Sequence, residues 1–288
     1  MTADPSHISM TAKLAAYYRQ FTDIPFAAEA ADRVGAADAF EALVRDHGLK
    51  REQLTFYAPM FEARYKSITE LIRKSGATQV LELASGYSLR GLDLTRHAGI
   101  RYVETDLAAV VETKRALLDD LRVRHGIAAS PHHVLTAADA LDLDALRAAA
   151  AVLDPAQPVV VLCEGLILYL TQAETERLAT NVHALLDDFG GTWMTPDFVV
   201  KAESPELPPE RARLREAITG ITQRQLDASS FDDAAALAAF LRRVGFEAVV
   251  RRQVDETPAF SSLGRLGLSA ELLERLRPAL RVWVMSPL

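Results

Sequence analysis

The residues best placed to do chemistry begin in a turn of small side chains that follows an apolar stretch. Residues 80–91 read Val-Leu-Glu-Leu-Ala-Ser-Gly-Tyr-Ser-Leu-Arg-Gly, which is typical of a strand that enters a tight turn and then a helix. Small residues let the backbone approach a ligand closely, at the strand end where doubly wound sheets bind cofactors. An ordinary strand–turn–helix corner has the same pattern. Because the G-x-G-x-x-G spacing is absent, a pyrophosphate-binding role has less support than another kind of cofactor site.

An acidic residue follows the next apolar run, about 20 positions beyond the turn. Residues 102–106 read Tyr-Val-Glu-Thr-Asp, so Asp106 stands where a carboxylate can accept hydrogen bonds from both hydroxyls of a ribose. Asp106 is equally suited to cap the following helix, since Asp accepts hydrogen bonds from free amides at a helix start. Glu104 is the local rival for the ribose. The preceding turn favours the ribose interpretation for Asp106.

Two further acids occur at similar places. Asp139 follows a third apolar run, where a carboxylate can accept from an exocyclic amino group such as adenine N6; taken alone, it is more typical of a helix cap or a solvated acid. Glu164 ends the apolar run Val161–Cys163, and a carboxylate is costly to bury there without a cation or hydrogen-bond donors. A sulfonium cofactor with an α-amino group supplies such a partner, whereas an arginine or the next turn is the structural alternative.

The elements that must position these acids alternate between short strands and amphipathic helices after residue 76. Before that point, residues 10–75 read as mainly helical, with apolar residues at helical spacing. Because right-handed crossovers place helices on both faces, the alternation predicts a parallel sheet covered on both sides. Strands are expected at Gln79–Leu83, Arg101–Thr105, His133–Leu135, Val159–Cys163, Thr192–Pro196, Glu247–Val254 and Leu280–Met285. Helices are expected at Thr11–Phe21, Glu52–Ser75, Leu107–Arg124, Asp142–Ala151, Gln172–Phe189, Asp232–Val244 and Ala270–Leu276.

Composition excludes several classes of protein. A net charge of −7 and a pI near 5.6 argue against a polyanion-binding surface, so no nucleic-acid partner is expected. Cys163 is the only cysteine, which excludes an intrachain disulfide and a cysteine-based zinc site, and His132-His133 lacks spaced acidic partners, so no metal is expected. The first ten residues do not read as a signal peptide, and every apolar run is shorter than the ~18–20 residues of a membrane span. We therefore expect a cytoplasmic globular protein without a membrane partner.

Taken together, these segments resemble the leucine carboxyl methyltransferase family, which includes polyketide O-methyltransferases of the tetracenomycin type. The resemblance covers nearly the whole chain, and it is specific through the order and spacing of the segments. The segments that carry it are Ile8–Ala12, Ala63–Lys66, Glu82–Arg90, Val103–Leu107, Asp139–Asp142 and Cys163–Leu170. The resemblance implies a doubly wound α/β fold, class I methyltransferase-like (Rossmann-like), with a seven-stranded sheet and a terminal antiparallel strand. Residues 1–75 would form an N-terminal helical lid and substrate region, and residues 76–288 the S-adenosylmethionine-binding core.

The same resemblance implies S-adenosylmethionine as the cofactor and assigns the turn to it. Glu82, Ala84 and Gly86 would line the turn, and Asp106 would hold the ribose hydroxyls. The sequence departs from the family here, since many relatives have a second glycine and an Asp-Thr-Arg ending, and a proline often follows the acidic residue. The detailed shape of the pocket is therefore left open.

The remaining cofactor contacts are implied at three further segments and at Arg90. Asp139 and Ala140 would frame the adenine, and Glu164 would face the amino group of the methionyl part. Arg64 would clamp the carboxylate of that part, for which a planar charged fork is well suited. Arg90 would assist Arg64 or stabilise the turn.

The expected reaction is methyl transfer to oxygen of a small-molecule acceptor. A carboxylate acceptor is already nucleophilic, whereas a hydroxyl benefits from a base. Tyr17, Tyr18 and Tyr169 are candidates for contacting the acceptor, and no residue is assigned a catalytic role. Two alternatives stay open: a protein C-terminal carboxyl methyltransferase, and a nucleotide-binding Rossmann protein without methyl transfer. The oligomeric state is not predicted.

Overall fold

The central sheet places the ends of its parallel strands beneath the N-terminal helices. The computed structural model describes residues 5–97, 99–203, 209–226 and 228–288. Within them, a seven-stranded sheet has the order β3-β2-β1-β4-β5-β7-β6, with β1 to β5 parallel and β7 antiparallel to both of its neighbours. The strands are β1 Gln79–Leu83, β2 Arg101–Asp106, β3 His133–Ala137, β4 Val159–Cys163, β5 Gly191–Thr195, β6 Phe246–Arg252 and β7 Arg281–Pro287. The expected doubly wound sheet with a terminal antiparallel strand is confirmed.

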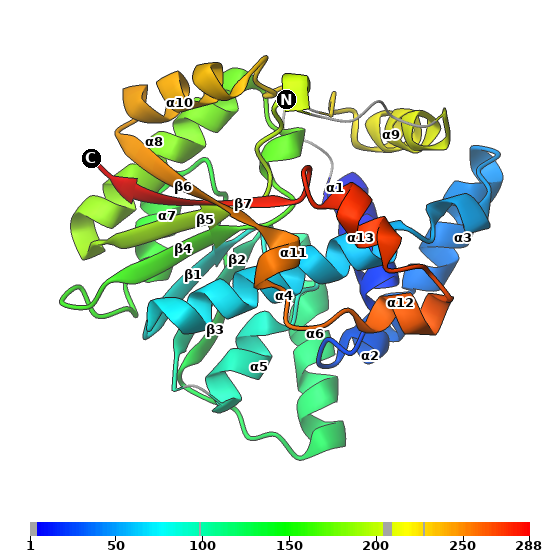
Figure 1. The fold of residues 1–288 in the computed structure, drawn as a ribbon. Coiled ribbons are helices and arrows are strands. Elements are labelled where there is room, and N and C mark those ends of the chain that lie inside the picture. Colours follow the sequence, from blue (N-terminus) through cyan, green and yellow to red (C-terminus); the bar gives the residue numbers. More distant parts are fainter. Residues whose placement is uncertain (1–4, 98, 204–208, 227) are drawn as a thin grey trace.

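Helices cover both faces of the sheet and one of its ends (Figure 1). The helices are α1 Pro5–Arg19, α2 Ala27–Arg33, α3 Ala36–Asp46, α4 Tyr57–Ser75, α5 Arg90–His97, α6 Ala108–His125, α7 Leu143–Ala150, α8 Gln172–Phe189, α9 Pro209–Thr222, α10 Ala234–Arg243, α11 Gln253–Glu256, α12 Ser261–Leu266 and α13 Glu271–Leu276. One face packs on α7, α8 and α10, and the other packs on α4 and α5. Helices α1, α2 and α3 form a third cluster with α6, α9 and the segment after β1.

The strands form where the sequence has uninterrupted apolar runs. Every residue of β1 and β4 is buried, as expected for parallel strands with helices on both faces. The register pairs Glu82 with Glu104 and with Leu162, so the two acids of β1 and β2 project from the same face. The carboxyl ends of these strands therefore present their acids and turns at one edge of the sheet.

Helix α4 differs from its expected boundaries. The sequence predicted one helix over Glu52–Ser75, but a 3-10 turn at Arg51–Leu54 comes first and α4 begins at Tyr57. Pro59 explains the later start, because proline is tolerated in the first turn of a helix and not in its interior. The following turns of α4, around Ile68 and Ile72, pack against the sheet. The division into residues 1–75 and 76–288 stays a prediction.

No helix in the part of the chain that the structure describes combines the length and the apolar character needed to cross a membrane.

Candidate functional site

The turn after β1 is held open by an unusual backbone and by the next strand. Ala84 and Gly86 have φ values of 52° and 51°, in the left-handed region that is uncommon for a residue with a side chain. Ser85 N–H donates to the Thr105 carbonyl at 2.9 Å, and Gly86 N–H donates to Asp106 Oδ2 at 2.7 Å. The turn after β1 and the acid that ends β2 are therefore joined directly.

Asp106 ties this turn to the start of α6 without capping that helix. Its Oδ1 accepts from Leu107 N–H at 2.8 Å, while Leu107 is the N-cap residue and no side chain caps the helix. The structure thus does not show the capping role that was the alternative for Asp106. Burial raises the pKa of this carboxyl, against two backbone hydrogen bonds that lower it. A carboxylate has about four lone-pair sites, so Asp106 keeps acceptor capacity for ribose hydroxyls, a role that stays a prediction.

Glu104, the rival for the ribose, is committed elsewhere. Its side chain is fully buried between Lys114 Nζ at 3.1 Å and His133 Nε2 at 2.9 Å. Burial raises its pKa, but the charges of Lys114 and His133 outweigh burial and lower the pKa to about 2. Lys114 also donates to Ser85 Oγ at 3.0 Å. Glu104 therefore belongs to a buried ion-pair cluster beneath the turn. The same cluster provides the acidic partner of His133, which the sequence did not reveal.

A second buried cluster joins the carboxyl ends of β1 and β4. Arg90 has a fully buried side chain and donates to Glu82 Oε1 at 2.5 Å and to Glu164 Oε2 at 2.6 Å. Tyr102 O–H donates to the other oxygen of Glu82 at 2.8 Å. Glu82 is thus buried under the turn, with both oxygens engaged. Arg90 therefore ties the ends of β1 and β4 together, and its expected role beside the cofactor stays a prediction.

Arg19, at the end of α1, completes this cluster and was not anticipated from the sequence. Its Nη2 donates to Glu164 Oε1, so Glu164 is held by two arginines from distant segments. Burial raises the pKa of Glu164, but the charges of Arg19 and Arg90 lower it to about 2. Glu164 therefore remains an anion at the end of β4, as an ammonium-binding residue must.

Helix α1 forms a roof over the turn. A side-chain carbon placed on Gly86 would lie 3.5 Å from Cβ of Ala12, and buried residues of α1 pack in one cluster with Tyr87 and Leu89 of the turn. The N-terminal helices thus enclose the site from the side opposite the sheet.

Arg64 and Asp197 lie on the far side of Glu164. Arg64 is half-buried, its guanidinium lies 5.7 Å from the ring centre of Phe61, and its positive charge acts on both Glu164 and Asp197. Asp197 follows β5 and accepts N–H bonds of 2.7 to 3.1 Å from Gly165, Leu166 and Ile167. Burial raises the pKa of Asp197. This acid shapes the segment after Glu164, and its position after a parallel strand was the sequence signal that could have identified it.

The adenine candidates lie after β3. Asp139 is exposed, and its Oδ1 accepts from Leu141 N–H at 2.9 Å, whereas Asp142 caps α7. Ala140 is buried, and its carbonyl accepts from Asn181 Nδ2 at 3.2 Å. The position of both residues at the strand end leaves adenine binding a prediction.

The tyrosines proposed to contact the acceptor fall into two groups. Tyr17 stacks on Phe40 with ring centres 3.8 Å apart, and Tyr18 stacks on Phe61 at 5.3 Å. Both are buried in the helical cluster, so their packing gives no support to an acceptor contact, which stays a prediction. Tyr169 is half-buried in a 3-10 turn that begins three residues after Glu164, and it is the better placed candidate.

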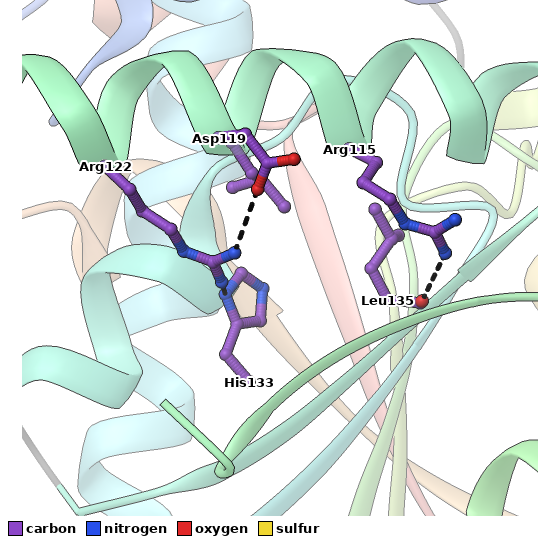
Figure 2. A pocket seen from close by; sticks show the side chains of 6 residues that line it. Arg115, Asp119, Arg122, His133 and Leu135 are labelled. Atoms are coloured by element: carbon purple, nitrogen blue, oxygen red, sulfur yellow. Dashed lines mark hydrogen bonds and ion pairs between the residues drawn. The ribbon is translucent and has the colours of Figure 1, made fainter. Parts of the chain in front are cut away.

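A separate groove of about 230 Å³ lies between α6 and the edge strand β3 (Figure 2). Arg115 donates to the Leu135 carbonyl at 3.3 Å, and Arg122 pairs with Asp119 at 3.5 Å. Arginines that engage the backbone of an edge strand protect it from pairing with other chains. The groove is built on the edge of the sheet, whereas the acids described above lie at the strand ends.

The residues at the strand ends fit S-adenosylmethionine. Asp106 offers acceptors suited to hydroxyls, and Glu164 offers an anion suited to an ammonium group. Arg19 Nε is buried and has no hydrogen-bond partner in the structure, and such a donor suits a negatively charged oxygen. The site therefore has complements for the ribose, the amino group and the carboxylate of this cofactor.

Comparisons with known proteins point to S-adenosylmethionine-dependent methyltransferases. The leucine carboxyl methyltransferase family matches residues 21–183. A protein of Mycolicibacterium smegmatis, whose name assigns it to the S-adenosyl-L-methionine-dependent methyltransferases, is 29% identical over 239 residues, covering 78% of this chain and 68% of its own. A relative of the same description from Mycobacterium bovis is 34% identical over 158 residues, which are 52% of this chain and 49% of its own.

A solved structure supports the fold. A DUF574 family protein of Streptomyces avermitilis superposes with a TM-score of 0.58 over 96% of each chain, at 15% sequence identity. At this identity, the likeness establishes the fold alone.

Proposed function

The chain belongs to the leucine carboxyl methyltransferase family, and from that premise we propose that it methylates an oxygen atom of a small-molecule acceptor. Its dependence on S-adenosylmethionine and its methyltransferase class follow from the family and the relatives. The acceptor oxygen proposed here belongs to a carboxyl or a hydroxyl group.

In this proposal the residues of the chain bind the cofactor and orient the methyl donor toward the acceptor. S-adenosylmethionine, when bound, supplies a methyl group on a positively charged sulfur, which an oxygen nucleophile displaces in line. Asp106 would accept from the ribose hydroxyls and Glu164 from the amino group, while the bond from Gly86 to Asp106 fixes the turn. Holding donor and acceptor at near-attack distance can supply much of the rate enhancement. No proton transfer by a side chain is required if the acceptor is a carboxylate.

Enclosure is the observation that carries the small-molecule proposal. Ala12 of α1 packs over Gly86, and Arg19 of the same helix reaches Glu164. A roof that contacts both the turn and the end of β4 favours a compact acceptor and excludes water from the transfer. Tyr169 lies close in sequence to Glu164, at the end of β4, and is the side chain that we expect to contact the acceptor.

The experiment is transfer of a tritium-labelled methyl group from S-adenosylmethionine. Small carboxylic acids and phenols form one panel, and peptides with a free C-terminus form the other. Alkali releases volatile methanol from a methyl ester and leaves a methyl ether intact, which separates the two acceptor oxygens. We expect labelled small molecules, loss of labelling in Asp106→Ala, and unchanged labelling in Asp144→Ala, which removes an exposed acid of α7.

The alternative within the family is a protein C-terminal carboxyl methyltransferase, which the family description itself favours. Alkali-labile label on peptides alone would replace the small-molecule proposal with this one. A product that carries the label on nitrogen or carbon, identified by mass spectrometry, would contradict both.

A further inference from the structure

The two edges of the sheet differ in how they are covered. At the β3 edge, Arg115 of α6 engages the backbone of the strand at the Leu135 carbonyl. The other edge is β6 (Figure 1), where six of the seven residues are exposed. Val249 and Val250 of this strand are 55% and 48% exposed. A long edge strand with exposed apolar side chains is a site for pairing with another chain.

The backbone groups of β6 point alternately toward β7 and away from it. The register between the two strands is continuous over the whole of β6. At its ends, Leu288 N–H donates to the Gly245 carbonyl and Gln253 N–H donates to the Leu280 carbonyl, both at 2.9 Å. Because hydrogen-bonded positions alternate with open ones in an antiparallel ladder, the odd-numbered residues between Gly245 and Gln253 bond to β7. The even-numbered residues therefore direct their N–H and C=O groups to the open edge.

We propose that this edge binds a second copy of the chain, by antiparallel pairing of β6 with β6 about a two-fold axis at Val249. In this register, Ala248 of one copy exchanges both of its N–H···O bonds with Val250 of the other. These groups need a partner, because outside the β6–β7 ladder the backbones of Ala248 and Val250 have none among the described residues. Val249 of each copy meets Val249 of the other across the axis. The same surface is used on both copies, so the assembly closes as a dimer.

The charged side chains of β6 select this partner and this register. Glu247 and Arg251 are exposed, and neither is in an ion pair within the described part of the chain. Pairing about Val249 sets Glu247 of each copy directly opposite Arg251 of the other, at a position where facing side chains come close. Sliding one copy by two residues keeps the outward groups paired but sets Glu247 or Arg251 opposite Val249. Charges that discourage pairing with an arbitrary strand are thus complementary to a second copy.

The dimer leaves the proposed cofactor site accessible. Strands β4, β5 and β7 lie between β1 and β6 in the sheet, so the paired edge is remote from the turn after β1. The inference therefore does not rest on the proposed function, and substitutions in β6 leave the residues of that site in place. One seven-residue strand from each copy buries a small surface, so we expect a weak, reversible dimer.

The test is sedimentation equilibrium of the full chain as the wild type, Glu247→Arg, Arg251→Glu and the double variant with both changes. Each single change sets like charges opposite each other twice in the dimer, so we expect its dissociation constant to rise at least about tenfold. The double variant should dimerise as the wild type does. An equimolar mixture of the two single variants should also recover wild-type affinity, because the introduced arginine of one then faces the introduced glutamate of the other.

Glu112→Arg is the matched control, because it makes the same change of charge at an exposed residue of α6, and it should dimerise as the wild type does. Thermal unfolding of each variant verifies the fold. A wild type that stays monomeric up to about 0.5 mM would overturn the proposal. So would a dimer that neither single change weakens, or a loss of affinity that mixing the two single variants does not restore.

Discussion

Two buried glutamates, Glu104 in β2 and Glu164 after β4, lie on either side of β1 and are both held by positively charged side chains. Glu104 and Glu164 both have a pKa lowered to about 2 by cations that outweigh burial. The partners of Glu104 are Lys114 and His133, from α6 and β3, the elements that follow β2. Those of Glu164 are Arg90 and Arg19, and Arg19 comes from the opposite end of the chain. Each cluster borders a described cavity: His133 of the first lines the groove beside α6, and Arg19 of the second lines a small cavity beneath α1.

The difference separates a cluster that supports the fold from one that is built to bind. In the Glu104 cluster, Oε1 lies 3.1 Å from Lys114 Nζ and Oε2 lies 2.9 Å from His133 Nε2, and both partners come from the elements that follow β2. In the Glu164 cluster, Arg90 begins α5 and Arg19 ends α1. The origin of its partners, more than burial or a shifted pKa, distinguishes the Glu164 cluster, because Arg19 brings the N-terminal helix α1 to the end of β4.

The largest expected effect is on the stability of the Glu104 cluster. Lys114→Met leaves Glu104 buried with His133 as its remaining partner, and removing one member of a buried ion pair costs about 3–5 kcal/mol. Urea unfolding should show this loss in the free energy of unfolding. Arg147→Ala, which breaks a half-exposed pair with Asp188, is the control and should cost less than about 1 kcal/mol. If Lys114→Met also cost less than about 1 kcal/mol, the Glu104 cluster would not stabilise the fold as proposed.

A smaller effect is expected from filling the space beside the same cluster. In Gly91→Ala, the added carbon would lie 2.8 Å from His133 Nε2 and 2.9 Å from Glu104 Oε1. Such overpacking costs about 1–3 kcal/mol, even though alanine favours a helix. Gly220 of α9 has nothing within 4 Å of its added carbon, so Gly220→Ala should stabilise by up to about 1 kcal/mol. We expect Gly91→Ala to lower the unfolding temperature and Gly220→Ala to raise it. A higher unfolding temperature for both variants would contradict the close packing around Gly91.

The smallest effect is on the pH dependence of stability, which a bound ligand should change at Glu164 and not at Glu104. A carboxyl whose pKa is lowered from 4.5 to about 2 contributes stability that is present above pH 4.5 and lost as the pH falls through 2. The advantage of the wild type over Glu104→Gln and over Glu164→Gln should therefore shrink across this window. S-adenosylhomocysteine should move the window of Glu164 to lower pH, because its ammonium adds a cation there. If S-adenosylhomocysteine shifted the pH window of Glu104 by the same amount, the proposed difference between the two clusters would be wrong.

The sheet could be predicted because its strands are short apolar runs bounded by polar turns. β1, β4 and α8 begin and end where the sequence placed them. The location of Asp106 at the same edge of the sheet as the turn after β1 also followed from the rule that the ends of parallel strands bind cofactors. The break before α4 was missed because the helical spacing of apolar residues continues through Phe61. That spacing does not show that Pro59 must lie in the first turn of a helix.

The partners of the site residues could not be read from the sequence. Arg19 ends a helix, where an arginine is ordinarily solvated, and only the docking of α1 carries it to Glu164. Tyr17 and Tyr18 were proposed as acceptor contacts, yet their stacking on Phe40 and Phe61 is set by the packing of α1 on α3 and α4. The spacing of residues along the sequence does not show toward which neighbour a side chain points once the helices have packed.

The most direct test of the cofactor site is calorimetric titration of the purified protein with S-adenosylmethionine, S-adenosylhomocysteine and NAD. The account predicts that the first two bind and that NAD does not. Asp106→Ala should bind both adenosyl ligands at least tenfold more weakly, because it removes the acceptor for the ribose and the bond that fixes Gly86. A folded protein that binds NAD, or whose affinity for S-adenosylmethionine is unchanged in Asp106→Ala, would contradict the account.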